Sequence, residues 1–188
     1  MRTFKFPGRD LQVFYRADWG AEAPRRKTAL RTPVSQVDIH TTVTYNHPVG
    51  TPWQEVGRSW KGIQNYHRNT LGWNDIGYNF GVDRAGRIFV GRGPRLQGAA
   101  TEYRNHLIIS IVTIGNTDAI KPTRKQRKSI VKLIRRLQTQ GVLTQYIKVA
   151  GHRKYSTKGK TCPGVQFTDK MIYKIQLKVN RNPGKPRS

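Results

Sequence analysis

The segment from Val149 to Gly164 contains residue types that could bind a metal and assist hydrolysis. It holds Cys162, the single cysteine of the chain, with His152 ten positions before it and Lys160 two positions before it. Imidazole nitrogen and thiolate sulfur are ligands that zinc prefers, at roughly 2.0–2.3 Å. One histidine and one cysteine do not make a site, so another part of the chain must supply a third ligand.

The chain has four further histidines, which are His40, His47, His67 and His106. His40 lies at the end of an apolar run over residues 34–41, and strand ends are where open sheets place functional side chains. Three protein ligands with a fourth position left open are typical of a catalytic zinc. A single histidine is more often a packed core or surface residue, so the spacing of His40, His152 and Cys162 leaves both interpretations open. We expect the remaining histidines not to bind metal, and His67 to have a structural role on a helix.

The elements that would position these side chains alternate between strands and helices. Apolar runs predict strands at 34–41, 107–114 and 146–150, and a hairpin formed by residues 76–82 and 87–90. Helical spacing of apolar residues predicts helices at 53–71, at 123–140 and from Thr168 onward. The predicted fold class is therefore α/β: a single domain with a central mixed β-sheet flanked by α-helices, and the zinc site at one sheet edge.

Charge is the outlying feature of the composition. Lys and Arg number 35 against 10 Asp and Glu, which gives a net charge of +25. Such a field attracts polyanions without sequence preference, and both nucleic acid and an anionic bacterial envelope are candidates. No window approaches ~18 consecutive apolar residues, so we expect no transmembrane helix. The first seven residues lack an apolar segment typical of a secretory signal, and one cysteine excludes an internal disulfide, so we expect synthesis in a reducing cytoplasm.

Eight short blocks, in this order, resemble the N-acetylmuramoyl-L-alanine amidase type 2 family, which includes peptidoglycan recognition proteins and amidase-type phage lysozymes. The resemblance runs from about Arg16 to about Ile175. The blocks are Arg16-Ala17-Asp18-Trp19-Gly20-Ala21, Ile39-His40-Thr41-Thr42, Ile63-Gln64-Asn65-Tyr66-His67, Gly72-Trp73-Asn74-Asp75-Ile76-Gly77-Tyr78-Asn79-Phe80, Gly91-Arg92-Gly93, Ile114-Gly115-Asn116, Gly151-His152-Arg153 and Thr161-Cys162-Pro163-Gly164.

The resemblance implies a Zn²⁺ ion held by His40, His152 and Cys162. It also implies a tyrosine near the metal, which matches Tyr78, and in phage-type members a catalytic lysine, which matches Lys160. The family cleaves the amide bond between N-acetylmuramic acid and the L-alanine of the stem peptide. Zinc lowers the pKa of its water to roughly 7, while a cation and a hydroxyl group could stabilise the oxyanion or relay a proton.

Three side chains in or near these blocks are candidates for substrate binding. Trp73, Asn79 and Arg92 could line a groove for glycan and peptide, although Trp73 fits a core anchor equally well. Asp38 and Asp75 are the carboxylates nearest to the blocks. They could support a ligating histidine, but a hydrogen bond at a turn or at an element junction is the favoured interpretation.

The chain departs from the family in four places. The second histidine of a His-His-Thr sequence is replaced by Thr41, and Gly98-Ala99-Ala100 stands where many relatives have a histidine linked with substrate contact. The interval from His152 to Cys162 is longer by two residues than in many relatives. The strand segment 111–114 has no carboxylate of the kind that serves as a base in related recycling amidases, so any such role falls to Tyr78 or Lys160.

The leading functional hypothesis is a zinc amidase of a phage or bacterium that lyses the cell wall, made in the host cytoplasm and acting on the wall after release. We divide it into an N-terminal arm at 1–33, irregular but packed on the domain, a zinc amidase domain at 34–179 and a basic flexible tail at 180–188. Helix 123–140 and the tail could bind anionic wall polymers or a lipid surface. We expect a monomer and no specific nucleic acid partner, since no motif supports one. The alternative is a non-catalytic peptidoglycan-binding module with a basic envelope-binding surface, and the presence of Cys162 favours the enzyme.

Overall fold

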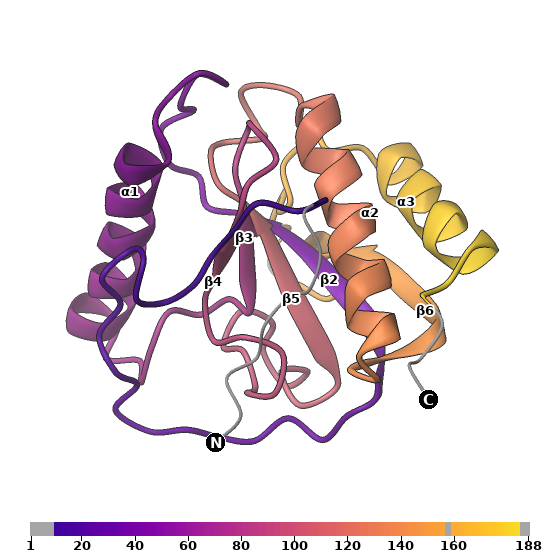
Figure 1. The fold of residues 1–188 in the computed structure, drawn as a ribbon, viewed down its shortest axis with the longest axis horizontal. Coiled ribbons are helices and arrows are strands. Elements are labelled where there is room, and N and C mark those ends of the chain that lie inside the picture. The colour runs from indigo at the N-terminus through magenta and orange to yellow at the C-terminus, as the bar shows by residue number, and fades with distance from the viewer. Residues whose placement is uncertain (1–9, 157–158, 185–188) are drawn as a thin grey trace.

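A mixed β-sheet forms the centre of the molecule (Figure 1). The computed structural model describes residues 10–156 and 159–184. Within these ranges the sheet has six strands in the order β1-β4-β3-β5-β2-β6, all pairs parallel except β3 with β4. The strands are β1 Val13–Phe14, β2 Val34–Thr41, β3 Phe80–Val82, β4 Ile88–Val90, β5 Ile108–Thr113 and β6 Leu143–Gly151. The α/β class with one mixed sheet is confirmed.

Three α-helices cover the two faces of this sheet, and two short helices of other types interrupt the loops of the described chain. The α-helices are α1 Trp53–Asn65, α2 Arg124–Thr139 and α3 Asp169–Arg181, with a π-helix η1 at Tyr66–Thr70 and a 3-10 helix η2 at His152–Lys154. None of the described helices is both long enough and apolar enough to cross a bilayer.

Alternation along the central strands divides the core into two layers. Val37 and Ile39 of β2 belong to the larger apolar cluster, which contains the inward residues of α2 and α3. Val112 of β5 belongs to the second cluster, which contains Val56 and Trp60 of α1. His40 pairs with Val112 across β2 and β5, and paired residues on neighbouring strands point to the same face. His40 therefore projects toward the α1 side, opposite α2 and α3.

The helix predicted at 123–140 agrees closely with α2 because its end signals are local. The Thr123 side chain accepts a hydrogen bond from the Gln126 amide, and the Gln126 side chain accepts one from Thr123, which forms a capping box. Gly141 follows the helix with φ of 65°, a backbone conformation that glycine adopts without strain. Thr168 likewise caps α3.

The N-terminal arm is more regular than predicted. We expected residues 1–33 to be irregular, but Val13 and Phe14 form β1, which pairs in parallel with β4 at the sheet edge. Phe14 stacks on Trp53 and Phe89, with ring centroids 4.3 and 5.1 Å apart. This burial of aromatic surface explains the short strand, which has too few residues to show alternation in the sequence. Residues 1–9 lie outside the described part of the chain.

Two predicted element ends also differ from the structure. The helix expected over 53–71 is α-helical only to Asn65 and then continues as η1. The tail expected from residue 180 begins inside α3, where the Asn180 side chain bonds both the amide and the carbonyl of Ile147, at 3.0 and 2.9 Å. These contacts to β6 hold the last turn of α3, so the helix extends to Arg181. Residues 185–188 of the expected tail lie outside the described ranges.

Candidate metal centre and groove

His40, His152 and Cys162 lie together at one edge of the sheet. One ligand atom from each residue lies within 4.8 Å of the other two. The His40 Nδ1 atom is 3.7 Å from the Cys162 Sγ atom, and the two imidazole centroids are 4.6 Å apart. β2 supplies the first histidine, η2 after β6 supplies the second, and the loop before α3 supplies the cysteine. These three side chains form the group in the described chain that could hold a metal ion, as the sequence suggested.

A hydrogen-bonded chain behind His40 sets its orientation. The Thr101 hydroxyl donates to Asp38 at 3.2 Å and lies 3.3 Å from the His40 Nε2 atom. Because the hydroxyl proton goes to Asp38, the hydroxyl can accept the Nε2 proton of His40. The Nδ1 lone pair is then directed toward Cys162. Asp38 is fully buried and also accepts from Gln36 at 2.6 Å. This arrangement favours a supporting role for Asp38, one of the two interpretations that the sequence left open.

The loop that carries Cys162 is held by Arg153. The Arg153 amide donates to the Cys162 carbonyl at 2.5 Å, and its guanidinium donates to the carbonyl groups of Thr161 and Phe167 at 3.2 and 3.0 Å. The Thr117 hydroxyl donates to the Pro163 carbonyl on the other side. These hydrogen bonds therefore hold the segment that carries Cys162 in place. Residues 157–158, within the interval that is longer than in many relatives, lie outside the described chain.

Burial keeps the donor atoms of the cluster uncharged. It lowers the pKa of His40 well below the usual histidine value, and the neighbouring His152 lowers it further. The pKa of His152 is lowered by burial and by the charge of Lys160. Burial raises the pKa of the Cys162 thiol to about 11. Both imidazoles are thus neutral at pH 7 with a lone pair to donate, and the thiol retains its proton while no cation binds it.

Tyr78 and Lys160 both lie beside the cluster. The Tyr78 ring centroid is 5.6 Å from that of His40, and its other neighbours are Trp60 and His67. Burial raises the pKa of Tyr78 above the usual value for a phenol, with a further contribution from Cys162. Its hydroxyl group is therefore a proton-bearing donor at neutral pH. Lys160 is exposed, and its positive charge acts on both His152 and Cys162.

A groove of about 470 Å³ leads up to the cluster. Trp73 and Lys160 lie on it together with His152, so one of the three predicted substrate-binding residues lines the groove. Ala99 and Ala100 also line it, and Ala100 occupies the position of the missing histidine. No sequence motif identifies the other residues of the lining, which are Glu102, Tyr103, Asn105, Tyr155 and Ser156.

The other two predicted substrate-binding residues, Asn79 and Arg92, have structural roles, and neither is in the lining of this groove. Asn79 is 1% exposed; its side-chain oxygen accepts from the Ser110 amide and hydroxyl, and its nitrogen donates to two loop carbonyls. Arg92 donates to the carbonyl groups of Ile76 and Gln97 at 2.7 and 2.9 Å. Both side chains hold loops at the sheet end, and their contact with substrate stays a prediction. Both residues belong to motifs of the family, but a motif does not show whether a residue binds substrate or stabilises a loop.

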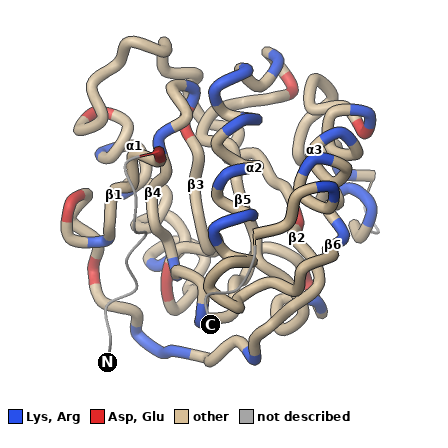
Figure 2. Tube along the Cα trace, turned by 45° about the vertical axis from the view of Figure 1, so that its right-hand side comes forward, with Lys and Arg blue, Asp and Glu red and all other residues tan. Residues whose placement is uncertain are grey.

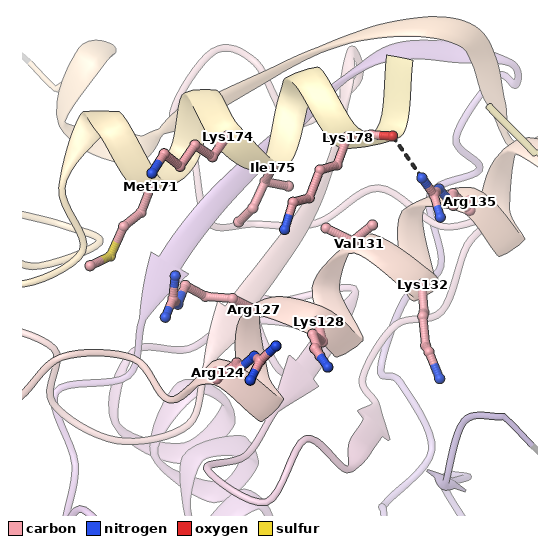
Figure 3. A pocket seen from close by; sticks show the side chains of 10 residues that line it. All are labelled: Arg124, Arg127, Lys128, Val131, Lys132, Arg135, Met171, Lys174, Ile175 and Lys178. Carbon is pink, nitrogen blue, oxygen red and sulfur yellow. Dashed lines mark hydrogen bonds between the residues drawn. The ribbon is translucent and has the colours of Figure 1, made fainter. Parts of the chain in front are cut away.

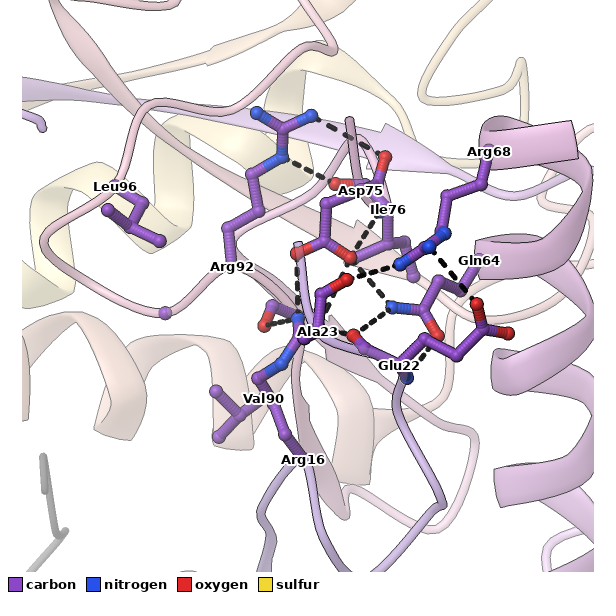
Figure 4. Close-up of polar contacts among 12 residues, drawn as sticks. Arg16, Glu22, Ala23, Gln64, Arg68, Asp75, Ile76, Val90, Arg92 and Leu96 are labelled. Carbon is purple, nitrogen blue, oxygen red and sulfur yellow. Dashed lines mark hydrogen bonds and ion pairs between the residues drawn. The ribbon is translucent and has the colours of Figure 1, made fainter. Parts of the chain in front are cut away.

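Asp75, itself buried, belongs to a second polar network (Figure 4). Arg16 of the arm donates to both Asp75 oxygens, at 2.9 and 3.2 Å, and Gln64 of α1 donates to one at 2.7 Å. Glu22 connects the same network to Arg68 at 3.1 Å. The Arg16-to-Ala21 block and the Gly72-to-Phe80 block are therefore joined by an ion pair. This is the junction role that the sequence favoured for Asp75.

The remaining histidines lie away from the donor atoms of the cluster. The His47 ring is 2.8 Å from the Ser59 hydroxyl and the His67 Nδ1 atom accepts from the Gly77 amide at 3.0 Å, whereas His106 is exposed. Thr101, which lies behind the cluster, is a residue that the sequence did not single out. It lies in a loop whose sequence shows no motif and no periodicity, so only the structure reveals its place beside His40 and Asp38.

The architecture defined here is that of peptidoglycan recognition proteins. The solved structure of wild-type Drosophila PGRP-LB matches 93% of this chain and 96% of that chain, with a TM-score of 0.78 and 27% identity. Peptidoglycan recognition protein LE, solved in complex with tracheal cytotoxin, a monomeric diaminopimelic acid-type peptidoglycan, matches 88% of this chain and 92% of that chain, with a TM-score of 0.78 and 27% identity.

Comparison of the amino-acid sequence with known proteins shows the family to which the chain belongs. Residues 30–165 match the N-acetylmuramoyl-L-alanine amidase family, and the chain belongs to that family. Peptidoglycan-recognition protein LB of Drosophila melanogaster is 32% identical over 153 residues, which are 81% of this chain and 64% of that protein. The human protein named N-acetylmuramoyl-L-alanine amidase is 30% identical over 156 residues, 82% of this chain and 27% of that protein. The chain thus spans less than two thirds of both relatives.

Proposed function

We propose that this protein is a zinc-dependent peptidoglycan amidase that cleaves the bond between N-acetylmuramic acid and the L-alanine of the stem peptide. The observation that carries the proposal is the convergence of His40, His152 and Cys162 beside a groove lined by Trp73 and Lys160. Membership of the amidase family supports the reaction. A relative solved with a peptidoglycan fragment supports the substrate class.

The donor set fits zinc in type, and the separation of His40 from Cys162 suits a zinc site. In a tetrahedral site with Zn–N and Zn–S distances of about 2.0 and 2.3 Å, the nitrogen and sulfur atoms lie about 3.5 Å apart. The His40 Nδ1 and Cys162 Sγ atoms are 3.7 Å apart, close to that value. Both imidazoles are neutral, as ligands must be, and the Cys162 thiol would release its proton on binding.

Hydrolysis adds water to the carbonyl carbon and breaks the C–N bond, which leaves a lactyl carboxylate and the free amino group of L-alanine. A bound zinc ion would supply Lewis acidity, which activates water and polarises the carbonyl group. Tyr78 keeps its proton and is suited to donate a hydrogen bond to the developing oxyanion. Lys160 provides positive charge at the groove, and we assign to its ammonium the proton for the leaving amine; its neutral amine then takes up the proton that the attacking water releases.

We further propose that the enzyme is lytic, degrading intact bacterial wall as a monomer after release from the cell that makes it. The metal ligands, the groove and the two catalytic candidates all come from one chain, so no second copy is needed. A net charge of +25 favours association with an anionic envelope, because a field of this size attracts polyanions and speeds encounter.

Digestion of purified peptidoglycan tests the reaction. Wild-type protein should release new alanine amino termini, and chelation or Cys162→Ser should abolish the release. Lys160→Met should lower kcat by about a hundredfold or more while zinc content is unchanged. Lys154→Met, at an exposed lysine of η2, is the matched control and should retain activity. New reducing sugar ends, or full activity of Cys162→Ser, would show that the proposal is wrong.

The same experiment separates the alternative, a binding module without catalysis. Several relatives are named as recognition proteins, which favours that role in this fold. A module of this kind would sediment with peptidoglycan and release no amino termini, with or without added zinc. Release that depends on both zinc and Cys162 supports the enzyme.

A further inference from the structure

A basic groove of about 440 Å³ runs between α2 and α3, and we call it the α2–α3 groove (Figure 3). Its floor is apolar and consists of Val131, Met171 and Ile175. Its walls consist of seven cationic side chains and no carboxylate. These are Arg124, Arg127, Lys128, Lys132, Arg135, Lys174 and Lys178. Figure 2 shows Lys and Arg recurring along both helices.

The charge of this groove is not neutralised within the described chain. None of the seven cations forms an ion pair with a described carboxylate, and Lys132 and Arg135 donate to backbone carbonyl groups. Arg135 donates to the Lys178 carbonyl at 2.8 Å, which ties α2 to α3. Lys128 and Lys132 are four residues apart on α2, and like charges at this spacing destabilise a helix. The fold therefore maintains uncompensated repulsion here, which a bound polyanion would relieve.

The shape and lining of the groove select among polyanions. It is concave and lies between two helices, whereas a bilayer presents a broad surface to a convex or flat partner. No aromatic side chain is in its lining, so it lacks the stacking platforms on which single-stranded nucleic acids bind. A thin chain with alternating phosphates and short apolar units matches cationic walls and an apolar floor.

We propose that the α2–α3 groove binds a linear phosphodiester polymer without bases, of the poly(glycerol phosphate) type found in bacterial walls. The groove lies on the opposite face of the sheet from His40, because its floor residues belong to the cluster shared by α2 and α3. Polymer in the groove therefore leaves the cluster and its own groove open. The site goes beyond the amidase activity, since it would hold the molecule on the wall while catalysis proceeds elsewhere.

Binding of synthetic poly(glycerol phosphate) to the full chain, measured at several salt concentrations, tests this proposal. The triple variant Lys128→Gln, Lys174→Gln and Lys178→Gln should bind at least tenfold more weakly. By counterion release, three lost contacts should reduce the slope of log K against log salt by about two. The matched control is Lys27→Gln, Lys121→Gln and Lys170→Gln, which has the same net charge but leaves the groove intact. It should keep the wild-type slope.

Several outcomes would overturn the proposal. Equal losses in the two triple variants would mean that net charge alone attracts the polymer. Equal or tighter binding of an oligothymidylate with the same number of phosphates would reassign the groove to nucleic acid, and lysine-dependent binding that is tighter to phosphatidylglycerol vesicles would reassign it to membrane. Cys162→Ser should bind the polymer as wild type does, which separates failure of this site from failure of the proposed amidase.

Discussion

His40 can act as a ligand only if one ring nitrogen is held toward the other two donors. The Thr101 hydroxyl, itself bonded to buried Asp38, fixes the Nε2 proton and directs Nδ1 toward Cys162. Tyr78 shows the same dependence on neighbours, because its packing against His40 and Trp60 brings it to the cluster while adjacent Asn79 is buried in a loop. Tyr78 and Asn79, which are consecutive in one motif, thus have different surroundings.

Thr101→Val is expected to weaken zinc binding by about tenfold to a hundredfold, because the His40 ring loses the partner that sets its tautomer. Competition with a chromophoric zinc chelator measures this directly, without reference to activity. Thr139→Val, which changes the same atoms at the end of α2, is the control. If the two variants bind zinc equally well, Thr101 does not position His40.

At the scale of elements, the arm is anchored to the loop before β3 by the Arg16–Asp75 ion pair. Asp75 is 1% exposed and Arg16 is partly buried, so neither charge is fully solvated. The Trp19 indole also donates to the Val90 carbonyl of β4 at 3.0 Å. Residues of two sequence blocks that identify the family, Arg16 and Trp19 in one and Asp75 in the other, therefore hold the arm against the sheet.

Arg16→Met is expected to lower the free energy of unfolding by about 3 kcal/mol, since it leaves a buried carboxylate without its cation. Urea unfolding with a common m-value measures the change. Arg136→Met removes an arginine whose partner, Asp10, is about half exposed, and it should cost about 1 kcal/mol or less. Equal decreases in the free energy of unfolding of the two variants would mean that the Arg16–Asp75 pair contributes no more to stability than an exposed pair.

The stability of the fold should depend on pH through His67, which lies in η1. Burial, helped by the charge of Arg92, lowers the pKa of His67 from 6.5 to about 4. The unfolded chain therefore binds more protons than the folded chain between these values, so stability falls as the pH falls from about 6.5 toward about 4. The limiting slope is about 1.4 kcal/mol per pH unit, and partial exposure of the ring reduces it.

Unfolding free energies of wild type and His67→Gln across this pH range test that expectation. Glutamine can still accept the Gly77 amide hydrogen bond but does not titrate. The variant should therefore show a shallower decline in stability toward acid. Parallel curves for the two proteins would mean that other groups account for the pH dependence.

At the scale of the whole molecule, the three proposed metal ligands join segments that are far apart in the chain. His40 and Cys162 are separated by 122 positions and come from β2 and the loop before α3. A ligand that binds only the folded chain stabilises it by mass action, by about 4 kcal/mol at a thousandfold excess over its Kd. The proposed zinc ion should therefore strengthen the entire fold.

Saturating zinc is expected to raise the Tm of wild-type protein by roughly 10 °C, and chelation should reverse the rise. Differential scanning calorimetry of chelated and zinc-loaded samples measures the shift. Cys162→Ser should lose most of this increment, because one of three ligands is replaced by a hydroxyl group. A similar rise in wild type and Cys162→Ser would place zinc at another site.

The sequence alone determined the α/β class, the helix ends at Thr123 and Gly141, the family and the three residues of the cluster. These depend on short-range periodicity, on capping side chains and on motifs, all of which can be read from neighbouring positions. Only the tertiary structure decided that Thr101 lies beside His40, that Asn79 and Arg92 donate to loop carbonyl groups, and that α2 and α3 enclose a basic groove. These depend on contacts between distant segments: the direction of a loop side chain is set by the packing around it, which no local pattern encodes.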